Sequence, residues 1–200
     1  AMGCPRFTVR RRGEDVIYIC LKVAGEHNVL NALGVFAAAD FLGIAPEAIK
    51  EGLESFTGTK RRFEHIGSYH GCDIVDDYAH HPTEIEATLK TAKSMHYRET
   101  WVVFQPHTYS RTKSLLTDFA RVLPLADHVM IADIYPARER YDGTIHACDL
   151  AFLIPGAIYM SDMNAIARYL KEHVKDGDLL ITMGAGNVNQ IAYQMAADKT

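Results

Sequence analysis

The pattern of apolar and polar positions along the chain changes once, after a short first part. This first part predicts two strands followed by two helices, at 7–10, 15–22, 27–42 and about 46–55. Gly13 suits a turn between the two strands, and Pro46 suits the first turn of the second helix. The polar stretch that follows, FTGTKRRF, contains a glycine, and we therefore predict a domain boundary near residue 57.

Beyond that boundary, short apolar runs alternate with longer amphipathic segments. The runs predict strands at 72–78, 100–105, 128–134, 157–160 and 178–184. The amphipathic segments predict helices at 82–95, 111–123, 146–153, 162–173 and 187–197. Apolar strands separated by helices are typical of an α/β fold, in which a mostly parallel sheet is covered by helices on both faces.

Polar segments with several chemically active side chains occur where four of the predicted strands end. They are DDYAHH (76–81), QPHTYSR (105–111), DIYPARE (133–139) and GAGN (184–187). In a parallel sheet of this kind, ligands bind beyond the carboxyl ends of the strands. We therefore expect all four segments to line one rim of the sheet.

The first of these segments continues as DDYAHHPTEI (76–85) and allows three interpretations. It offers four metal ligands, Asp76, Asp77, His80 and His81. Adjacent residues rarely point at one ion, however, and no second cluster supplies the other ligands. The segment can instead cap the helix that follows, with Thr83 or Glu86 satisfying backbone N–H groups. The third interpretation is a substrate site, because Tyr78 and His80 can donate and accept hydrogen bonds beside a helix N-terminus, which attracts anions.

Two other segments of the predicted rim carry weaker signals. Arg111 lies with His107 in QPHTYSRT and can hold a carboxylate through two parallel hydrogen bonds. Beside DDYAHH on the same rim, it is a candidate anchor for the carboxylate of an amino acid. GAGN lacks the third glycine of a dinucleotide fingerprint and follows the last strand, so it does not predict an NAD site. A tight turn and a close approach of the backbone to a ligand both remain open.

Two further groups precede the predicted sheet. Asn28 and Asn31, in GEHNVLNAL, are one helical turn apart and share a face. Their amides either bind the edge of a purine or belong to the first turn of the helix. Arg61 and Arg62, in KRRFE, lie next to the predicted boundary, where they either reach a phosphate or are solvated.

Composition excludes several classes of partner. The formal net charge of −4 at pH 7 gives no overall attraction to nucleic acid or to anionic membranes. The four cysteines are scattered and form no CxxC pair, so we expect reduced thiols in a cytoplasmic protein rather than disulfides or a zinc ribbon. No apolar run reaches the ~18 residues that a membrane-spanning helix needs. We therefore expect neither a nucleic-acid nor a membrane partner.

Five segments, taken together and in this order, resemble one family. GEHNVLNAL, KRRFE, DDYAHHPTEI, FQPHTYSRT and GAGN closely resemble the Mur ligases of bacterial peptidoglycan synthesis, in particular those that add L-alanine to UDP-N-acetylmuramate. Members of this family have a UDP-sugar domain, a central ATP-binding domain with a P-loop, and a Rossmann-like third domain that carries the amino acid. The resemblance implies that residues 1–57 are the end of the central domain and that 58–200 are the complete third domain.

The resemblance also implies an activity and the roles of individual residues. The substrates would be UDP-N-acetylmuramate, L-alanine and ATP with Mg²⁺, and no metal ligand or tightly bound cofactor is expected in this chain. The residues that match the L-alanine pocket are Tyr78, His80, His107 and Arg111. The residues that match the ATP site are Asn28, Asn31, Arg62 and Asp77. His80 would accept the amine proton, and Thr108 stands where some relatives have a second arginine.

The resemblance has one large departure, since no GxxxxGK[ST] motif occurs in the chain. We therefore expect a portion of a longer ligase, which folds but does not ligate alone. Two other functions remain open. A metal-dependent phosphohydrolase would use Asp76, Asp77, His80 and His81. A non-catalytic Rossmann-type domain would bind a small ligand in the same pocket without any ligase half.

Overall fold

The computed structural model describes residues 4–198 and divides the chain into two compact units. The first unit is 1–59 and the second is 60–200. The break therefore lies two residues beyond the position near residue 57 that we predicted from composition.

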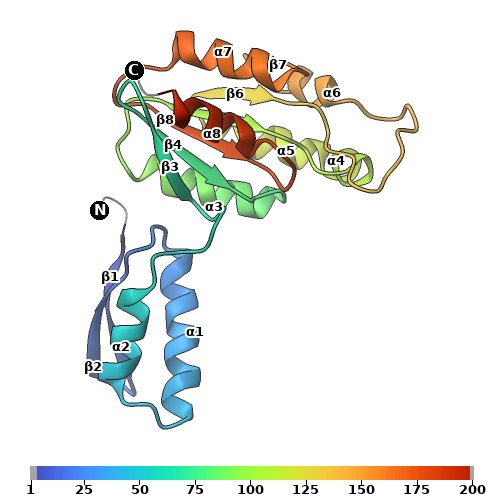
Figure 1. Ribbon diagram of the computed structural model, residues 1–200. Helices are drawn as coiled ribbons and strands as arrows, with labels where there is room; N and C mark the ends of the chain where they lie inside the picture. Colours follow the sequence, from blue (N-terminus) through green and yellow to red (C-terminus); the bar gives the residue numbers. More distant parts are fainter. Residues whose placement is uncertain (1–3, 199–200) are drawn as a thin grey trace. The chain divides into compact units, whose positions relative to one another are not determined.

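The first unit is a two-stranded hairpin with two helices (Figure 1). Strands β1 (Arg6–Arg11) and β2 (Glu14–Cys20) are antiparallel, and helices α1 (His27–Phe41) and α2 (Pro46–Ser55) follow. Gly13 completes the hairpin turn with a φ of 90°, a conformation that favours glycine. The buried side chains of this unit form a small core of Val9, Ile19, Leu21, Ala32, Phe36 and Ile49.

The second unit is a six-stranded sheet with helices between the strands. Its strands are β3 (Glu64–Tyr69), β4 (Cys72–Asp77), β5 (Thr100–Phe104), β6 (His128–Ile131), β7 (Ile158–Tyr159) and β8 (Leu179–Met183). Its helices are α3 (Pro82–Lys93), α4 (Tyr109–Ser114), α5 (Leu116–Val122), the 3₁₀ helix η1 (Leu123–Leu125), α6 (Ala147–Phe152), α7 (Met163–His173) and α8 (Asn189–Ala197). The strand order is β3-β4-β8-β5-β6-β7, and all neighbours are parallel except β3 and β4.

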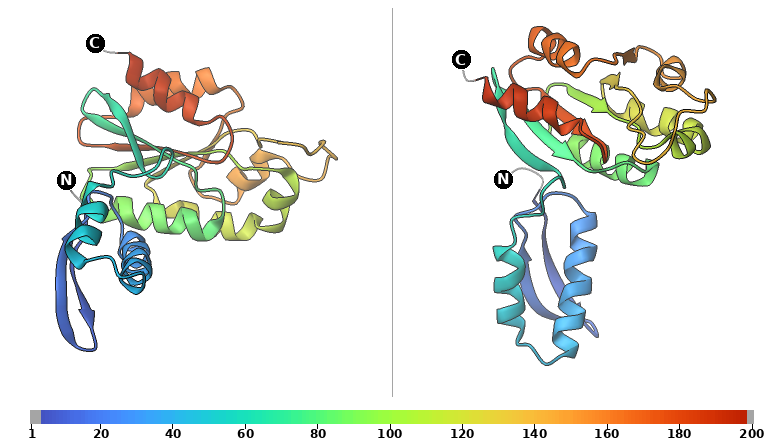
Figure 2. Two further views of the ribbon diagram at one scale, coloured as in Figure 1. Left: turned by 60° about the horizontal axis from the view of Figure 1, so that its bottom comes forward. Right: turned by 45° about the vertical axis from the view of Figure 1, so that its right-hand side comes forward.

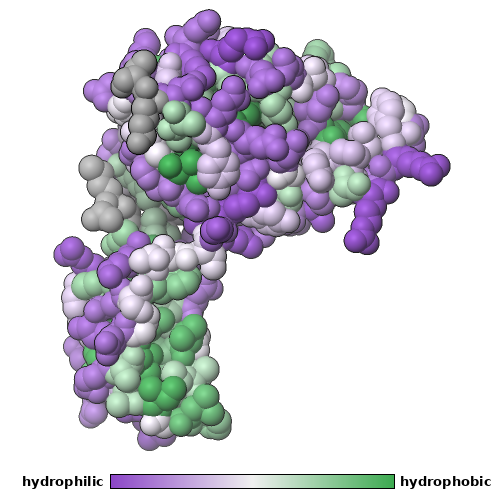
Figure 3. Space-filling model, viewed as in Figure 1, coloured by the Kyte–Doolittle hydropathy of each residue, from purple (hydrophilic) through white to green (hydrophobic). Residues whose placement is uncertain are grey.

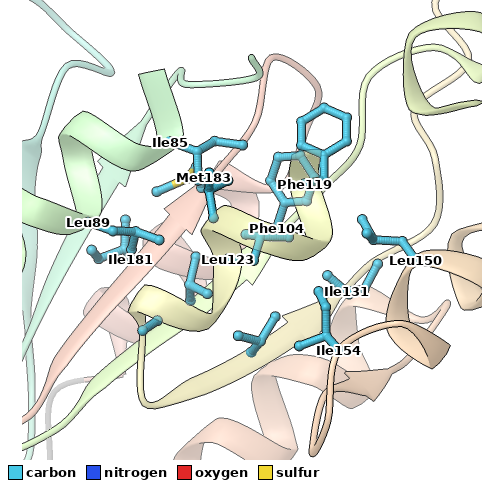
Figure 4. Packing of buried hydrophobic residues seen from close by; sticks show 14 of the residues in the cluster. Ile85, Leu89, Phe104, Phe119, Leu123, Ile131, Leu150, Ile154, Ile181 and Met183 are labelled. Atoms are coloured by element: carbon cyan, nitrogen blue, oxygen red, sulfur yellow. The ribbon is translucent and has the colours of Figure 1, made fainter. Parts of the chain in front are cut away.

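Helices cover both faces of this sheet (Figure 2). Side chains of alternate strand residues point to opposite faces, so Val102 and Phe104 pack under α3, α5 and α6, whereas Trp101 and Val103 pack under α7 and α8. Figure 4 shows the first of these cores, in which the rings of Phe104 and Phe119 lie 5.2 Å apart. The predicted α/β fold, with a mostly parallel sheet between two layers of helices, is confirmed.

Two elements differ from the predictions. The sequence analysis missed β3, an antiparallel edge strand whose residues are only partly buried, so that its apolar pattern is weak. Its turn into β4 is formed by His70 and Gly71, both with positive φ, which is typical of a two-residue hairpin loop. The single helix predicted at 111–123 is in fact α4 and α5, because Leu115 has φ −112° and ψ 16° and interrupts the helix.

Candidate functional site

The four polar segments lie along one rim of the sheet in the second unit. They follow β4, β8, β5 and β6, which are neighbours in the sheet and run parallel. Backbone hydrogen bonds join adjacent segments. The N–H of Gly184 donates to the carbonyl of Asp77 at 3.0 Å, and the N–H of Tyr135 donates to the carbonyl of Pro106 at 2.8 Å. The predicted rim is therefore present.

The side chains that we predicted to hold L-alanine form a continuous group on this rim. The ring centroids of Tyr78 and His80 are 5.4 Å apart, and those of His80 and His107 are 5.8 Å apart. The Arg111 guanidinium lies 3.3 Å from Nδ1 of His107. Tyr135, which the sequence analysis did not single out, stacks on His107 with centroids 5.7 Å apart and planes at 19°. One guanidinium, two imidazoles and two phenol rings therefore meet on one surface.

His80 is held in one orientation by its own loop. Its Nδ1 lies 2.9 Å from the carbonyl oxygen of Tyr78, and its backbone N–H donates to Glu84 at 3.1 Å. A carbonyl oxygen only accepts hydrogen bonds, so Nδ1 carries the proton in this contact. In the neutral ring, Nε2 is then the free acceptor, which is the state that a general base requires.

His107 has the complementary arrangement. The Arg111 guanidinium can only donate, so Nδ1 of His107 is the acceptor in their contact and Nε2 carries the proton of the neutral ring. Partial burial lowers the pKa of His107 below its usual value, and the positive charges of Arg111 and of protonated His80 lower it further. In its neutral form, His107 therefore offers the Nε2–H group as a hydrogen-bond donor on the rim.

Arg61 makes a set of contacts that the sequence analysis did not predict, because the family resemblance gave a role only to its neighbour, Arg62. Its Nε donates to Asp76 at 2.8 Å, and its Nη1 and Nη2 donate to the carbonyls of Gly186 and Gly184 at 3.1 and 2.8 Å. Arg62, by contrast, has a side chain that is 55% exposed and lies 3.9 Å from Glu84. Residue type alone left both arginines as either phosphate ligands or solvated side chains, and the fold shows that they differ in burial and in contacts.

The acidic pair of DDYAHH binds protein groups. Asp76 is fully buried, and it accepts hydrogen bonds from Arg61 and from the Thr182 hydroxyl at 2.7 Å. Asp77 accepts from the N–H groups of Ala79 and Phe63 at 2.7 and 2.9 Å, and burial raises its pKa. The place of Asp77 in the ATP site, which the family resemblance implies, stays a prediction.

The structure supports the helix-cap interpretation of DDYAHHPTEI in altered form, but it does not support the metal interpretation. Within residues 4–198, no three His, Cys, Asp or Glu side chains gather in a way that could hold a metal ion. The phosphohydrolase hypothesis therefore has no structural support in this part of the chain. The segment does cap α3, but through His81, whose Nδ1 accepts from the Thr83 N–H at 3.4 Å, rather than through Thr83 or Glu86 as expected. The carboxylate of Glu86 instead pairs with Lys90 at 2.8 Å.

GAGN is a tight turn that packs against the protein itself. A Cβ atom at Gly186 would lie 2.3 Å from Oε1 of Gln105 and 2.7 Å from Cγ of Tyr135. The Gln105 amide in turn donates to Asn187 at 3.0 Å and accepts from the Val188 N–H at 3.1 Å. Of the two interpretations left open, the tight turn describes this segment, and the close approach at Gly186 is to side chains of the rim.

Comparison with known proteins identifies the family. Residues 61–186 match the family model described as "Mur ligase, glutamate ligase domain".

The chain belongs to the Mur ligase family.

Relatives of this Mur ligase chain are close and span almost all of it. A UDP-N-acetylmuramate–L-alanine ligase from Acetivibrio thermocellus is 49% identical over 98% of this chain, and one from Alkaliphilus metalliredigens is 45% identical over 98%. The crystal structure of the UDP-N-acetylmuramate–alanine ligase MurC from Thermotoga maritima superposes with a TM-score of 0.81 at 29% identity. The chain spans 43%, 44% and 43% of these three proteins, which is less than half of their length.

Asn28 and Asn31 lie in the first unit of this Mur ligase chain. The side-chain amide of Asn31 donates to Oδ1 of Asn28 at 3.1 Å, and that of Asn28 donates to the Ala24 carbonyl at 2.7 Å, so the predicted shared face is present. Both line a cavity of about 420 Å³ whose other walls are almost entirely apolar, formed by residues such as Leu21, Val35 and Phe56. Their predicted role in ATP binding is not tested by this arrangement.

Proposed function

We propose that this chain is part of an ATP-dependent ligase that joins L-alanine to the carboxylate of UDP-N-acetylmuramate through an acyl-phosphate intermediate. The observation that carries the proposal is the convergence of Tyr78, His80, His107 and Arg111 on one rim. The two ligases of that name that are 45% and 49% identical to the chain support the choice of substrates. ATP use would place the reaction in the cytoplasm. Among the described residues, no helix has the length and apolar character of a membrane span.

The pocket has a suitable group for each end of an amino acid. The Arg111 guanidinium pairs with the carboxylate, since a planar fork of donors matches two carboxylate oxygens. Nε2 of His80, the free acceptor, takes a proton from the ammonium group, so that the neutral amine can attack. The amine nitrogen then forms the amide bond to the acyl carbon, phosphate leaves with the bonding pair, and the second amine proton passes to water. ATP would supply the phosphoryl group that activates the acyl carboxylate, and Mg²⁺ would neutralise the charge of the phosphates.

The first unit fits the end of a larger ATP-binding domain. Leu30, Phe41 and Leu42 are 70%, 89% and 76% exposed, and Figure 3 shows apolar surface gathered over the helices of this unit. Exposed apolar area of this kind marks a surface that another part of the protein covers. The apolar cavity beside Asn28 and Asn31 suits a planar purine whose edge meets two amides. The Arg62 side chain is 55% exposed, and a phosphate can replace its 3.9 Å ion pair with Glu84.

Binding of L-alanine to the 200-residue chain tests the pocket directly. We expect L-alanine, but not D-alanine, to shift the ring signals of His80 and His107 in NMR spectra. Arg111→Met should abolish the shifts because it removes the carboxylate anchor. Arg121→Met is the matched control, since Arg121 lies on the neighbouring helix α5 with a 62% exposed side chain. L-alanine shifts that survive Arg111→Met would contradict the assigned pocket.

Turnover tests the rest of the proposal. The full-length protein that carries this chain should form ADP when it receives UDP-N-acetylmuramate, L-alanine, ATP and Mg²⁺, whereas the 200-residue chain should not. ADP formation by the chain alone would contradict the assignment of the phosphoryl-transfer machinery to a P-loop outside it. A full-length protein that binds L-alanine but forms no ADP would favour a binding domain over a ligase.

A further inference from the structure

Arg61 holds two separate segments of the rim with a single side chain. Its guanidinium uses three nitrogens for three acceptors: the Asp76 carboxylate and the carbonyls of Gly184 and Gly186. We propose that Arg61 is a positioning residue for the amino-acid pocket, which sets the placement of Tyr78 on one side and of the GAGN turn on the other. This inference rests on the proposed function, because it concerns the same pocket.

Arg61 contacts Tyr78 through both its side chain and its backbone. The guanidinium carbon lies 5.0 Å from the centroid of the Tyr78 ring, within the range of a cation–π contact. The carbonyl of Arg61 accepts the N–H of Tyr78 at 2.7 Å. The backbone of Arg61 has a φ of 59°, and its own N–H donates to Glu64 at 2.7 Å. This left-handed conformation lets one residue contact both the backbone and the ring of Tyr78.

The contacts with the GAGN turn reach the far side of the pocket. Gly186 packs against Tyr135, and Tyr135 stacks on His107. A shift of the turn therefore moves Tyr135, and with it the imidazole that contacts Arg111. Two carbonyls that point at one guanidinium are fixed relative to each other because the fork of donors is planar and rigid.

Asp76 holds the guanidinium itself in place. The carboxylate is fully buried, and its other oxygen accepts the Thr182 hydroxyl at 2.7 Å, so its orientation is determined from two directions. The Arg61 side chain is 21% exposed, and its guanidinium is occupied by Asp76, by the two glycine carbonyls and by the Tyr78 ring. We therefore assign it to positioning rather than to contact with the reacting atoms.

Arg61→Lys in the full-length ligase is the direct test. Lysine keeps the charge beside Asp76 but cannot bind both glycine carbonyls, because its ammonium group is a single point. We expect KM for L-alanine to rise about tenfold or more, with KM for ATP changed less than about twofold. Arg62→Lys should show the opposite split, with KM for ATP raised and KM for L-alanine kept.

Hydrogen exchange in the 200-residue chain supplies a readout that does not depend on turnover. The Gly184 N–H, which donates to the carbonyl of Asp77, should exchange faster in Arg61→Lys than in the wild type or in Arg62→Lys. If Arg61→Lys does not fold, Arg61→Gln combined with Asp76→Asn removes both charges of the ion pair, and we expect the same rise in KM for L-alanine.

The inference is overturned if KM for L-alanine stays within about twofold of wild type in a folded variant, whether or not the Gly184 amide exchanges faster. If the wild-type ligase does not use L-alanine at all, the proposed function fails. The exchange of Gly184 then still decides whether Arg61 holds the turn.

Discussion

Gly186→Ala should destabilise the second unit because there is no room for a methyl group. The new Cβ would lie 2.3 Å from Oε1 of Gln105, and 2.7 and 2.8 Å from Cγ and Cβ of Tyr135. Gly186 does not have the positive φ that favours glycine, so the cost comes from space and not from backbone strain. Real Cβ atoms essentially never approach other heavy atoms this closely, and the neighbours must therefore move.

The magnitude follows from which neighbours can move. The Gln105 amide is the end of a flexible side chain, but it holds both Asn187 and Val188, so moving it breaks two hydrogen bonds. Cβ of Tyr135 is attached to a backbone that is hydrogen-bonded to Pro106. Overpacking of this kind costs about 1–3 kcal/mol. With a urea m-value of ~2 kcal/mol/M, the unfolding midpoint should fall by about 1 M.

Tryptophan fluorescence is the natural assay. Trp101 is the only tryptophan of the chain, and it is 5% exposed in the core of the second unit, so its emission reports on that unit. Gly34→Ala provides the control, because Gly34 lies within α1 and a Cβ there would meet nothing within 4 Å. We expect it to stabilise α1 by about 0.5–1 kcal/mol and not to lower the Trp101 midpoint.

An unchanged midpoint in Gly186→Ala would refute the reasoning. It would mean that Tyr135 and Gln105 can move aside at no cost, and that the turn does not fix the rim. A lower midpoint in both variants would also count against it, because the loss would then follow any glycine replacement.

Three further outcomes are expected. Asp178→Ala should lower stability by about 2–3 kcal/mol in the same fluorescence assay, because it removes the acceptor of Arg98 at 2.7 Å and of the buried Trp101 Nε1–H at 3.2 Å. An NMR titration should place the pKa of His107 below ~6.5, the value of an unperturbed imidazole. The unfolded chain then binds this proton more readily than the folded one, so that His107 lowers stability as the pH falls from about 6.5 through its folded pKa. Burial and neighbouring carboxylates raise the pKa of Cys72 to about 12, so mass spectrometry should find Cys72 alkylated by iodoacetamide only after unfolding.

The local pattern of apolar and polar residues was enough to predict the architecture of the second unit and the rim on which the candidate site lies. Apolar runs and amphipathic segments alternate with clear boundaries, and parallel strands necessarily place their carboxyl ends on one edge. That rule brings together the segments that carry Tyr78, His80, His107 and Arg111, because these segments follow β4 and β5, which both pair with β8. The weak edge strand β3 was missed because its residues are partly exposed, and burial is the source of a strand's apolar pattern.

The sequence by itself determined which segments meet, and only the tertiary structure decided which side chains within them touch. Arg61 and Arg62 are adjacent and chemically identical, yet one is bound to carbonyls 123 and 125 positions away and the other faces solvent. Likewise, the crowding at Gly186 depends on Tyr135, which arrives from a different strand. Such contacts are set by backbone conformation and by partners distant along the chain, and local periodicity carries information about neither.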